Sequence, residues 1–329
     1  MIETNTPASR IAILYSHAQR SYFPTEQQYM SEAEVLPRAQ QISEHLNRMG
    51  HTVELFPGNL DMWDKIKKFK PELVLNLVDS VYGREDLCPT IPATLEILQV
   101  PYTGTGLVGL AINSNKYLTK NLLEQYGITT PKYQLIKSLS DQIDLGLDYP
   151  LIAKLNEVHG SVEIDDSAIC VDEKSLKKRI AFLMKAYNQP VLLEEFVVGR
   201  EVTVVVVQGK NMKVYAAEKI FPDSDSDYKI ISFADPTMQF AKYDLPDRIK
   251  AMIKRTFSVL KMDDYAKFDM RVDESGRHYI IDCNSNTALG SKEMFCPIGG
   301  ILELYGVSFD ELLHRLIHNA TKRRLPLVH

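Results

Sequence analysis

The sequence predicts a protein of mixed α/β and α+β class that begins with a parallel sheet. Three observations support this prediction: strand and helix patterns alternate in the first third, a β-rich run begins near Pro190, and two alternating runs flank a hairpin turn near the C-terminus. With 329 residues, the chain is longer than one hydrophobic core usually supports. We therefore expect two or three packed domains, with ligands in the clefts between them.

The first third alternates short apolar runs with helical patterns. Strands are predicted over 11–15, 52–56 and 73–78, and helices over 34–49, 60–69 and 92–98. This βαβαβ order implies a parallel sheet covered by helices on both faces. The polar stretch 17–31 fits neither period, so we expect an inserted loop there. We expect the N-terminal parallel α/β domain to span residues 1–110.

The second and third segments are predicted to be α+β. A long helical pattern over 107–126 ends at Gly127, with Pro131 soon after, as expected for a glycine C-cap and a proline that cannot continue a helix. Strands over 134–136, 151–155 and 167–171 and a helix over 174–187 predict a small central domain over 111–190. The C-terminal domain is expected over 191–329. Its polar stretch 221–244 has no amphipathic period and is predicted to be a lid loop.

The composition excludes several classes of protein. The 38 lysines and arginines against 43 acidic residues give a net charge of −5 and a pI near 5.9, so no general nucleic-acid or anionic-membrane surface is expected. The four cysteines form no C-x-x-C pair, which argues against a zinc site or a disulfide framework. The polar N-terminus lacks the apolar core of a signal peptide, and the apolar run 202–207 is too short to span a bilayer. We predict a cytoplasmic protein that binds neither nucleic acid nor membrane.

One glycine motif is rejected as a binding site. Residues 104–109 match G-x-G-x-x-G, and Glu124 lies near the distance expected for a ribose-binding acid. However, Glu124 falls inside the predicted helix rather than at the end of a second strand, and the preceding strand is short and carries Pro101. We therefore do not expect a nicotinamide dinucleotide site.

The most informative stretch is the predicted hairpin over 265–286. Its two alternating runs flank Asp273-Glu274-Ser275-Gly276, which is a strong hairpin signal. Alternation places two sets of side chains on one face of each strand: Lys267, Asp269 and Arg271, and Ile280, Asp282 and Asn284. If the loop closes symmetrically, Lys267 faces Asp282 and Asp269 lies diagonal to it. Two carboxylates and an amide oxygen then converge beside two cations.

These oxygens predict a magnesium site. Hard oxygen ligands without His or Cys are the set that Mg²⁺ prefers, usually alongside waters and nucleotide phosphates. The alternative is a surface hairpin whose charges pair weakly across the strands. Asp282 interrupts an apolar run, 279–283, that is expected to be buried, and a buried carboxylate needs a metal or a partner to offset its desolvation. We therefore favour the metal site.

The hairpin resembles the metal-binding hairpin of ATP-grasp ligases, and the whole chain resembles the D-alanine–D-alanine ligase branch of that superfamily. Five segments in the family's order carry the resemblance: the opening strand, 91–104 leading into Asn115-Lys116-Tyr-Leu-Thr-Lys120, Tyr149-Pro-Leu-Ile-Ala-Lys154, Leu192-Leu-Glu-Glu-Phe-Val-Val-Gly-Arg-Glu201, and the hairpin. The similarity implies a three-domain ATP-grasp architecture, in which ATP lies between the central and C-terminal domains.

The resemblance also implies a set of ATP-binding residues. They are Lys116, Lys154, Ser161, Glu194, Glu195, Val197 and Glu201. The lysines match those that reach phosphate oxygens, and Ser161 lies in a flap whose backbone N–H groups cover the phosphates. Glu194, Glu195 and Val197 match the hinge beside the adenine. Glu201 matches the acid that accepts the ribose hydroxyls. Without the resemblance, these lysines and acids read as ordinary solvated charges.

A second set of residues is implied for the metal and the reaction. The resemblance gives Asp269, Asp282 and Asn284 as ligands of Mg²⁺, with Mn²⁺ as an alternative, and Lys267, Arg271 and Glu32 as catalytic residues. Lys267 replaces an arginine expected to stabilise the tetrahedral oxyanion, and Arg271 on the same face supplies part of what the lysine lacks. Glu32 matches the acid that receives the first substrate's ammonium. Equally, it reads as a first-turn acid favoured by the helix dipole.

Departures from the family pattern fall mostly on the amino-acid side. His159 and Glu163 stand where the flap usually has glycine, Gly160 replaces a substrate-holding serine, and 79–85 replaces a histidine and a glycine-rich motif. In the lid, Tyr228-Lys229 is the nearest match to the family's lysine and tyrosine, in reversed order. The pattern therefore implies a shared reaction and an altered substrate.

The predicted function is an ATP-dependent, ADP-forming ligase that joins a carboxylate to an amine through an acyl phosphate. Its substrates are expected to be small amino acids or peptides. Two alternatives stay open: a non-catalytic nucleotide-binding regulatory module, and a ligase that modifies a peptide or protein, with the insertion 17–31 opening or roofing its site. The retained metal residues argue against the first. The sequence leaves the oligomeric state open, a homodimer included.

Overall fold

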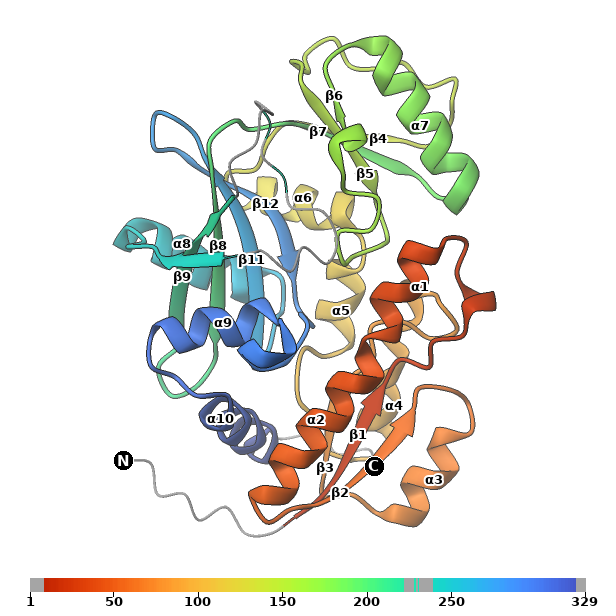
Figure 1. The fold of residues 1–329 in the computed structure, drawn as a ribbon, viewed down its shortest axis with the longest axis vertical. Coiled ribbons are helices and arrows are strands. Elements are labelled where there is room, and N and C mark those ends of the chain that lie inside the picture. Colours follow the sequence, from red (N-terminus) through yellow and green to blue (C-terminus); the bar gives the residue numbers. More distant parts are fainter. Residues whose placement is uncertain (1–8, 222–227, 229, 231–238, 324–329) are drawn as a thin grey trace.

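The computed structural model describes residues 9–221, 228, 230 and 239–323, and these residues form three β-sheets with their helices (Figure 1). The N-terminal sheet is parallel, with the order β2-β1-β3. Its unit contains β1 (Arg10–Tyr15), α1 (Glu26–Ala33), α2 (Val35–Arg48), β2 (Thr52–Pro57), α3 (Met62–Phe69), β3 (Leu73–Leu77) and α4 (Thr90–Ile97). Helix α2 packs on one face, and α3 and α4 pack on the other. The predicted parallel sheet with helices on both faces is confirmed.

The prediction of a loop over 17–31 is wrong. Arg20–Tyr22 forms a 3₁₀ helix, and most of α1 lies within the stretch. Thr25 is the N-cap of α1, because its hydroxyl accepts from the Gln28 N–H at 3.3 Å. The side chains that α1 buries, Gln28 and Glu32, are polar. Hydrophobic periodicity therefore could not reveal this helix.

The central sheet is antiparallel, with the order β4-β7-β5-β6. Its unit contains β4 (Tyr133–Ile136), β5 (Leu151–Leu155), β6 (Ile169–Cys170), α7 (Glu173–Tyr187) and β7 (Val191–Glu195). Strand β7 pairs with both β4 and β5, although the sequence analysis placed residue 191 at the start of the C-terminal domain. This pairing supports a domain boundary after Glu195, which we propose in place of 190.

The single helix predicted over 107–126 is in fact two helices, α5 (Leu107–Asn113) and α6 (Lys116–Gln125). Asn115 caps α6, because its side-chain oxygen accepts from the Leu118 N–H at 3.0 Å. The backbone N–H groups of Lys116 and Tyr117 donate to Asn156, just after β5, at 3.0 and 2.9 Å. The break therefore fixes Lys116 beside the central sheet.

The C-terminal sheet is antiparallel, with the order β10-β9-β8-β11-β12. Its unit contains β8 (Arg200–Val207), β9 (Lys213–Ile220), β10 (Gln239–Lys242), α8 (Asp247–Val259), β11 (Tyr265–Val272), β12 (His278–Asn284), α9 (Pro297–Leu304) and α10 (Phe309–Lys322). The even-numbered residues of β8 and β11 pack against α6 and α8, so the odd-numbered residues face the opposite way.

The predicted lid loop 221–244 is only partly described. Residues 239–242 form β10, which pairs with β9, so the prediction of a loop is wrong there. Residues 222–227, 229 and 231–238 lie outside the described residues. Of the Tyr228-Lys229 pair, only Tyr228 is described, and its ring meets that of Phe196 edge-on at 5.7 Å between centroids.

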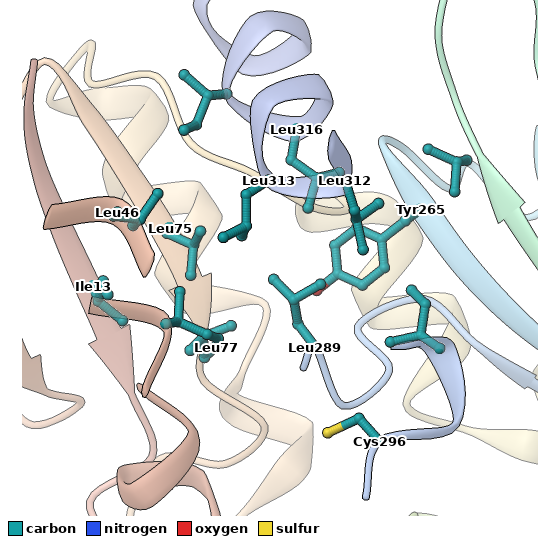
Figure 2. Packing of buried hydrophobic residues seen from close by; sticks show 14 of the residues in the cluster. Ile13, Leu46, Leu75, Leu77, Tyr265, Leu289, Cys296, Leu312, Leu313 and Leu316 are labelled. Carbon is teal, nitrogen blue, oxygen red and sulfur yellow. The ribbon is translucent and has the colours of Figure 1, made fainter. Parts of the chain in front are cut away.

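The N-terminal and C-terminal units share one hydrophobic core. Figure 2 shows the side chains that meet there: Ile13, Leu46, Leu75 and Leu77 from the first unit, and Tyr265, Leu289, Cys296, Leu312, Leu313 and Leu316 from the last. The central sheet has a separate core with α7. The first and last units are thus packed as one body. No helix of the described chain is both long and apolar enough to cross a membrane.

The glycines of 104–109 have a packing role. Gly104 has a φ of 89°, and its backbone N–H donates to the Asp264 carboxylate at 2.7 Å. A Cβ on Gly109 would lie 2.3 Å from the carbonyl oxygen of Lys261. These contacts explain the motif without a nucleotide.

Candidate active site

A cavity of about 740 Å³ is lined by residues of all three units. Every site residue predicted from the sequence lines it: Glu32, Lys116, Lys154, Ser161, Glu194, Glu195, Val197, Glu201, Lys267, Asp269, Arg271, Asp282 and Asn284. The odd-numbered face of β8 and β11 forms one wall, and the start of α2 and the residues directly after β3, Val78 and Asp79, contribute to the wall of the N-terminal unit.

The hairpin register differs from the predicted one. Asp269 lies directly opposite Asp282, and Lys267 lies opposite Asn284. The prediction that Lys267 faces Asp282, with Asp269 diagonal, is therefore wrong. The two carboxylates lie closer to each other along the ladder than the symmetric closure implied.

A β-bulge causes this difference. The register shifts next to Met270, which pairs with Ile280, so that Ile281 has no residue opposite. As a result Ile280 packs in the core with Met270, whereas Asp282 lines the cavity. The prediction that Ile280 shares a face with Asp282 is wrong for the same reason.

Asp269 is buried and anionic. It accepts from the Thr203 hydroxyl at 2.8 Å, lies 3.5 Å from the Lys219 ammonium and pairs with Lys267. Burial alone would raise the pKa of Asp269, but Lys219 and Lys267 outweigh burial and lower it to about 2.

Asp282 is anionic and forms no ion pair within 4 Å with another described residue. Its carboxylate accepts from the Cys283 N–H at 3.1 Å and lies 3.5 Å from the Asn284 amide nitrogen. Burial opposes ionisation, but the charges of Lys116 and Lys154 hold the pKa of Asp282 well below its usual range. A half-buried anion that is stabilised only at a distance can accept a further cation.

The donor set around Asp269 and Asp282 fits Mg²⁺. Within the described part of the chain, no group of three His, Cys, Asp or Glu side chains could hold a metal. Two carboxylates and the Asn284 amide oxygen leave positions for waters and phosphate oxygens, as Mg²⁺ usually requires. Asn284 lies two pairs along the ladder from the two carboxylates.

Glu194 is the buried centre of a lysine cluster. It is 1% exposed, and its oxygens lie 2.7 Å from Lys154 Nζ and 3.1 Å from Lys120 Nζ. Burial lowers the pKa of Lys116 and Lys120, whereas nearby carboxylates outweigh burial and raise that of Lys154. The sequence analysis gave Lys120 no role, because a lysine within a helix is normally solvated.

The residues after β7 form the rim of the cavity. Glu195 directs its carboxylate to Lys132 at 2.9 Å, and Val197 lines the cavity. Phe196, which the sequence analysis did not single out, lies against the Arg271 guanidinium, 4.8 Å from the ring centroid. This contact joins the central unit to the C-terminal sheet.

Glu201 is held by two cations, the buried Arg271 and the largely buried side chain of Lys219. It is 6% exposed, pairs with Lys219 and lies 2.9 Å from Arg271. Despite burial, Asp269 and Glu201 raise the pKa of Lys219. Nothing in the alternating pattern of β9 distinguishes Lys219 from a solvated lysine, so the sequence analysis missed it.

The flap 159–163 has side chains, those of His159 and Glu163, at two positions where glycine was expected from the resemblance, and hydrogen bonds hold its backbone. Ser161 and Glu163 have φ values of 55° and 59°, which cost a non-glycine residue about 1 kcal/mol or more each. Arg179 donates to the Glu163 carbonyl, and the Tyr187 hydroxyl donates to the Glu163 carboxylate at 2.7 Å. These bonds stabilise a backbone that glycine would adopt freely.

His159 ties the flap to the N-terminal unit. Its backbone N–H and Nδ1 lie 3.0 and 2.6 Å from the Glu85 carboxylate, and its Nε2 lies 3.0 Å from the Asn113 carbonyl oxygen. On the same side, the Glu163 N–H donates to Gln27 of α1 at 3.2 Å. Residues that the sequence analysis noted only as departures from the family pattern thus close the site.

Glu32 lies on the wall formed by the N-terminal unit. It is 6% exposed. Burial, with the nearby charges of Asp79 and Glu85, raises the pKa of Glu32 to about 8. Burial also raises the pKa of Asp79, to about 6. The sequence analysis found Glu32 but assigned no role to Asp79 or Glu85.

Comparisons with known proteins place this site in a family. The family described as D-ala D-ala ligase C-terminus matches residues 122–318. The D-alanine–D-alanine ligase B of Clostridium perfringens is 26% identical over 304 residues, which cover 90% of this chain and 96% of the relative. An uncharacterized protein, y4sG, of Sinorhizobium fredii is 24% identical over 295 residues, 84% of this chain and 85% of the relative.

A solved structure supports the fold. The D-alanine–D-alanine ligase from Bacillus anthracis, complexed with ATP, superposes with a TM-score of 0.75 at 18% identity, covering 95% of this chain and 97% of that one. The family match extends over more than half of the chain, from α6 to α10. The chain therefore belongs to the D-alanine–D-alanine ligase family of the ATP-grasp superfamily.

Proposed function

We propose that the chain joins a carboxylate to an amine at the expense of ATP, as an ADP-forming ligase, with an amino-acid substrate other than D-alanine. One observation carries this proposal: a single cavity has a cationic end with two facing carboxylates and an acidic end on the N-terminal wall. The first suits a nucleotide triphosphate and its metal, and the second suits the ammonium of an amino acid.

The cationic end has an excess of positive charge. Six cations, Lys116, Lys120, Lys154, Lys219, Lys267 and Arg271, lie in or beside the cavity with four carboxylates, Glu194, Glu201, Asp269 and Asp282. We assign Lys116 and Lys154 to the phosphates and Ser161 to the covering flap. Glu194, Glu195 and Val197 are assigned to the adenine side, and Glu201 to the ribose.

Asp269, Asp282 and Asn284 would hold Mg²⁺. When bound, the metal would neutralise charge on the phosphates during transfer. Glu32 would orient the substrate ammonium from the opposite wall, and the flap would exclude water from the acyl phosphate.

The chemistry proceeds in two steps. A substrate carboxylate oxygen attacks the γ-phosphorus, and the bond to the bridging oxygen breaks to give an acyl phosphate and ADP. An uncharged amine then attacks the acyl carbon, loses its proton, and inorganic phosphate leaves as the amide forms. The Lys267 ammonium, beside Asp269, is placed to stabilise the oxyanion of the tetrahedral intermediate.

The direct test measures ADP release and amide formation with ATP, Mg²⁺ and a panel of D- and L-amino acids and dipeptides. Lys267→Met should lower kcat by roughly 10² to 10³, the usual loss on removing one oxyanion donor, with little change in ATP affinity. Lys267→Arg should retain most of the activity, since it keeps the charge. Efficient use of D-alanine alone would contradict the altered substrate, and no ADP release with any compound would favour a nucleotide-binding regulatory module.

The closed roof favours a small substrate over a protein. The Thr25 and Tyr187 hydroxyls lie 2.7 Å apart, and Glu85 and Gln27 bind the flap directly. Since these contacts join the N-terminal unit to the central unit above the cavity, a folded protein chain could enter only if they opened.

Glu85→Gln should loosen the flap. Losing a hydrogen bond to a charged group costs about 1.5 to 3 kcal/mol, so we expect more acyl phosphate to be lost to water. The measurement is the ratio of ADP released to amide formed, which should rise above one. Glu26→Gln should leave the ratio unchanged, because Glu26 is an exposed residue of α1 whose ion pair among the described residues is with Arg20 at 2.6 Å. A tightly coupled Glu85→Gln enzyme would show that the flap closes without this contact.

A cytoplasmic location and a homodimer remain predictions from the sequence.

A further inference from the structure

The N-terminal wall of the cavity carries more acid than its own cations offset. Four carboxylates of this unit line the cavity, those of Glu32, Glu34, Asp79 and Glu85. The basic groups near them are Arg38, His159 from the flap and, near Glu85, Lys116. Acidic groups therefore outnumber basic groups at this wall.

Among these four carboxylates, the His159 ring makes its direct contact with Glu85. Its Nδ1 lies 2.6 Å from the Glu85 carboxylate, and its Nε2 lies 3.0 Å from a backbone carbonyl oxygen. Both ring nitrogens are thus occupied, so His159 has no ring nitrogen left to bond Glu32 or Asp79.

Arg38 offsets one further charge. Its Nε donates to the Glu34 carbonyl at 3.4 Å, and its guanidinium lies near Asp79, the Cys296 thiol and Glu34. No ion pair within 4 Å joins it to either carboxylate among the described residues. One guanidinium is thus shared between Glu34 and Asp79, and it bonds neither carboxylate directly.

Glu32 has an oxygen without a partner. The side chain is 6% exposed, and its buried Oε2 has no hydrogen-bond partner among the described residues. The Ser16 hydroxyl accepts from the N–H groups of Asp79 and Ser80 at 2.9 and 3.2 Å, which leaves its hydrogen for Glu32. The remaining oxygen of Glu32 is a buried acceptor at the cavity wall, and such an atom is costly unless a ligand donates to it.

Asp79 is held in place by a hydrogen bond of its backbone N–H, and its carboxylate makes none among the described residues. Its N–H donates to Ser16, while the described residues give its side chain no hydrogen bond and no ion pair within 4 Å. The carboxylate lines the cavity beside Glu32, and each acid is desolvated in the presence of the other's charge. Glu32, which is buried, and Asp79, which is half-buried, thus face the substrate space with no direct cationic partner among the described residues.

We propose that this wall selects an amino acid whose side chain carries a second positive charge on an amine, with Glu32 receiving one ammonium and Asp79 the other. This inference rests on the ligase function proposed above, since it places the amino acid in the same cavity. An ordinary α-amino acid supplies a single ammonium and leaves one carboxylate uncompensated. A diamino acid neutralises both, and its carboxylate is then directed toward the cationic end.

The test measures binding rather than turnover. Isothermal titration in the presence of Mg²⁺ and a non-hydrolysable ATP analogue compares 2,4-diaminobutyrate with norvaline, its uncharged counterpart of equal length, in both enantiomers. The pairs 2,3-diaminopropionate with 2-aminobutyrate and ornithine with norleucine cover shorter and longer reach. We expect at least one diamino acid to bind tenfold or more tightly than its counterpart, the scale of one charge-assisted hydrogen bond. Equal or weaker binding of all three diamino acids would overturn the proposal.

Asp79→Asn should remove the preference and leave the affinity for the uncharged counterpart within about twofold, since it keeps the shape and the backbone bond to Ser16. Asp86→Asn on the same loop is the matched control, because Asp86 is exposed and bonds Arg84 at 2.5 Å outside the cavity. An Asp79→Asn chain that weakens both ligands equally would contradict the assignment. A diamino preference without ADP release would support the subsite and refute the ligase. ADP release only with amino acids that have uncharged side chains would support the ligase and refute the subsite.

Discussion

Replacing Asp282 with asparagine should abolish ATP turnover while leaving the chain folded. The substitution keeps the shape of the side chain but removes one of two facing carboxylates, so the proposed metal would keep one anionic ligand, Asp269, beside the Asn284 amide. A bound metal contributes several kcal/mol to phosphoryl transfer, so we expect a loss of roughly 10³-fold or more in kcat. The measurement is Mg²⁺-dependent ADP release with the best substrate of the panel, alongside circular dichroism.

The control for this variant lies on the same hairpin. Glu274→Gln removes an equal charge at the exposed tip, 273–276, away from the cavity, and should retain full turnover. If Asp282→Asn turned over ATP at the normal rate, the hairpin would not be the metal site. The surface-hairpin interpretation would then regain support.

Replacing Glu194 with glutamine should produce the largest loss of stability. Glu194 neutralises Lys120 and Lys154 inside the protein, where the side chains of the two lysines are 4% and 11% exposed. Removing one partner of a buried ion pair typically costs about 3 to 5 kcal/mol, because the other charge stays buried and unpaired. Urea denaturation followed by circular dichroism should show this loss in the free energy of unfolding.

An exposed pair provides the comparison. Glu173 and Lys177 form an ion pair on α7 with side chains that are 65% and 67% exposed, so Glu173→Gln should cost less than about 1 kcal/mol. If Glu194→Gln were as stable as Glu173→Gln, the two lysines would have to lose their protons or reach water. The charge balance assigned to the cationic end would then be wrong.

The sequence could predict the candidate site because its residues depend on local order. Alternation along β11 placed Lys267, Asp269 and Arg271 on one face, and that face does line the cavity. The proposed metal ligands could also be identified from the sequence, because a carboxylate inside an apolar run is unusual. Such signals concern neighbours along one strand and need no knowledge of tertiary packing.

What the sequence could not predict depends on contacts between distant segments. The bulge at Ile281 changes the register by one residue, and nothing in a symmetric pair of alternating runs marks it. The break before Lys116 requires Asn156, forty residues away, to accept the first N–H groups of α6. The side chains that helix α1 buries, Gln28 and Glu32, are polar, and Glu32 faces the cavity, so the helix lacks the apolar stripe on which helix prediction relies.

The shared core of the first and last units has a consequence for cooperativity. Helices α2 and α10 bury side chains in one cluster, so the N-terminal and C-terminal units should unfold together. The central sheet with α7 has its own core, so it should be able to unfold separately. Nucleotide bound between the central sheet and the C-terminal sheet would then protect mainly the central amides from hydrogen exchange, in proportion to ligand concentration. The amides of β1 and β11 would exchange only through global opening. Ligand binding would therefore stabilise the central unit reversibly. The N-terminal and C-terminal units would keep the same protection from hydrogen exchange with or without ligand.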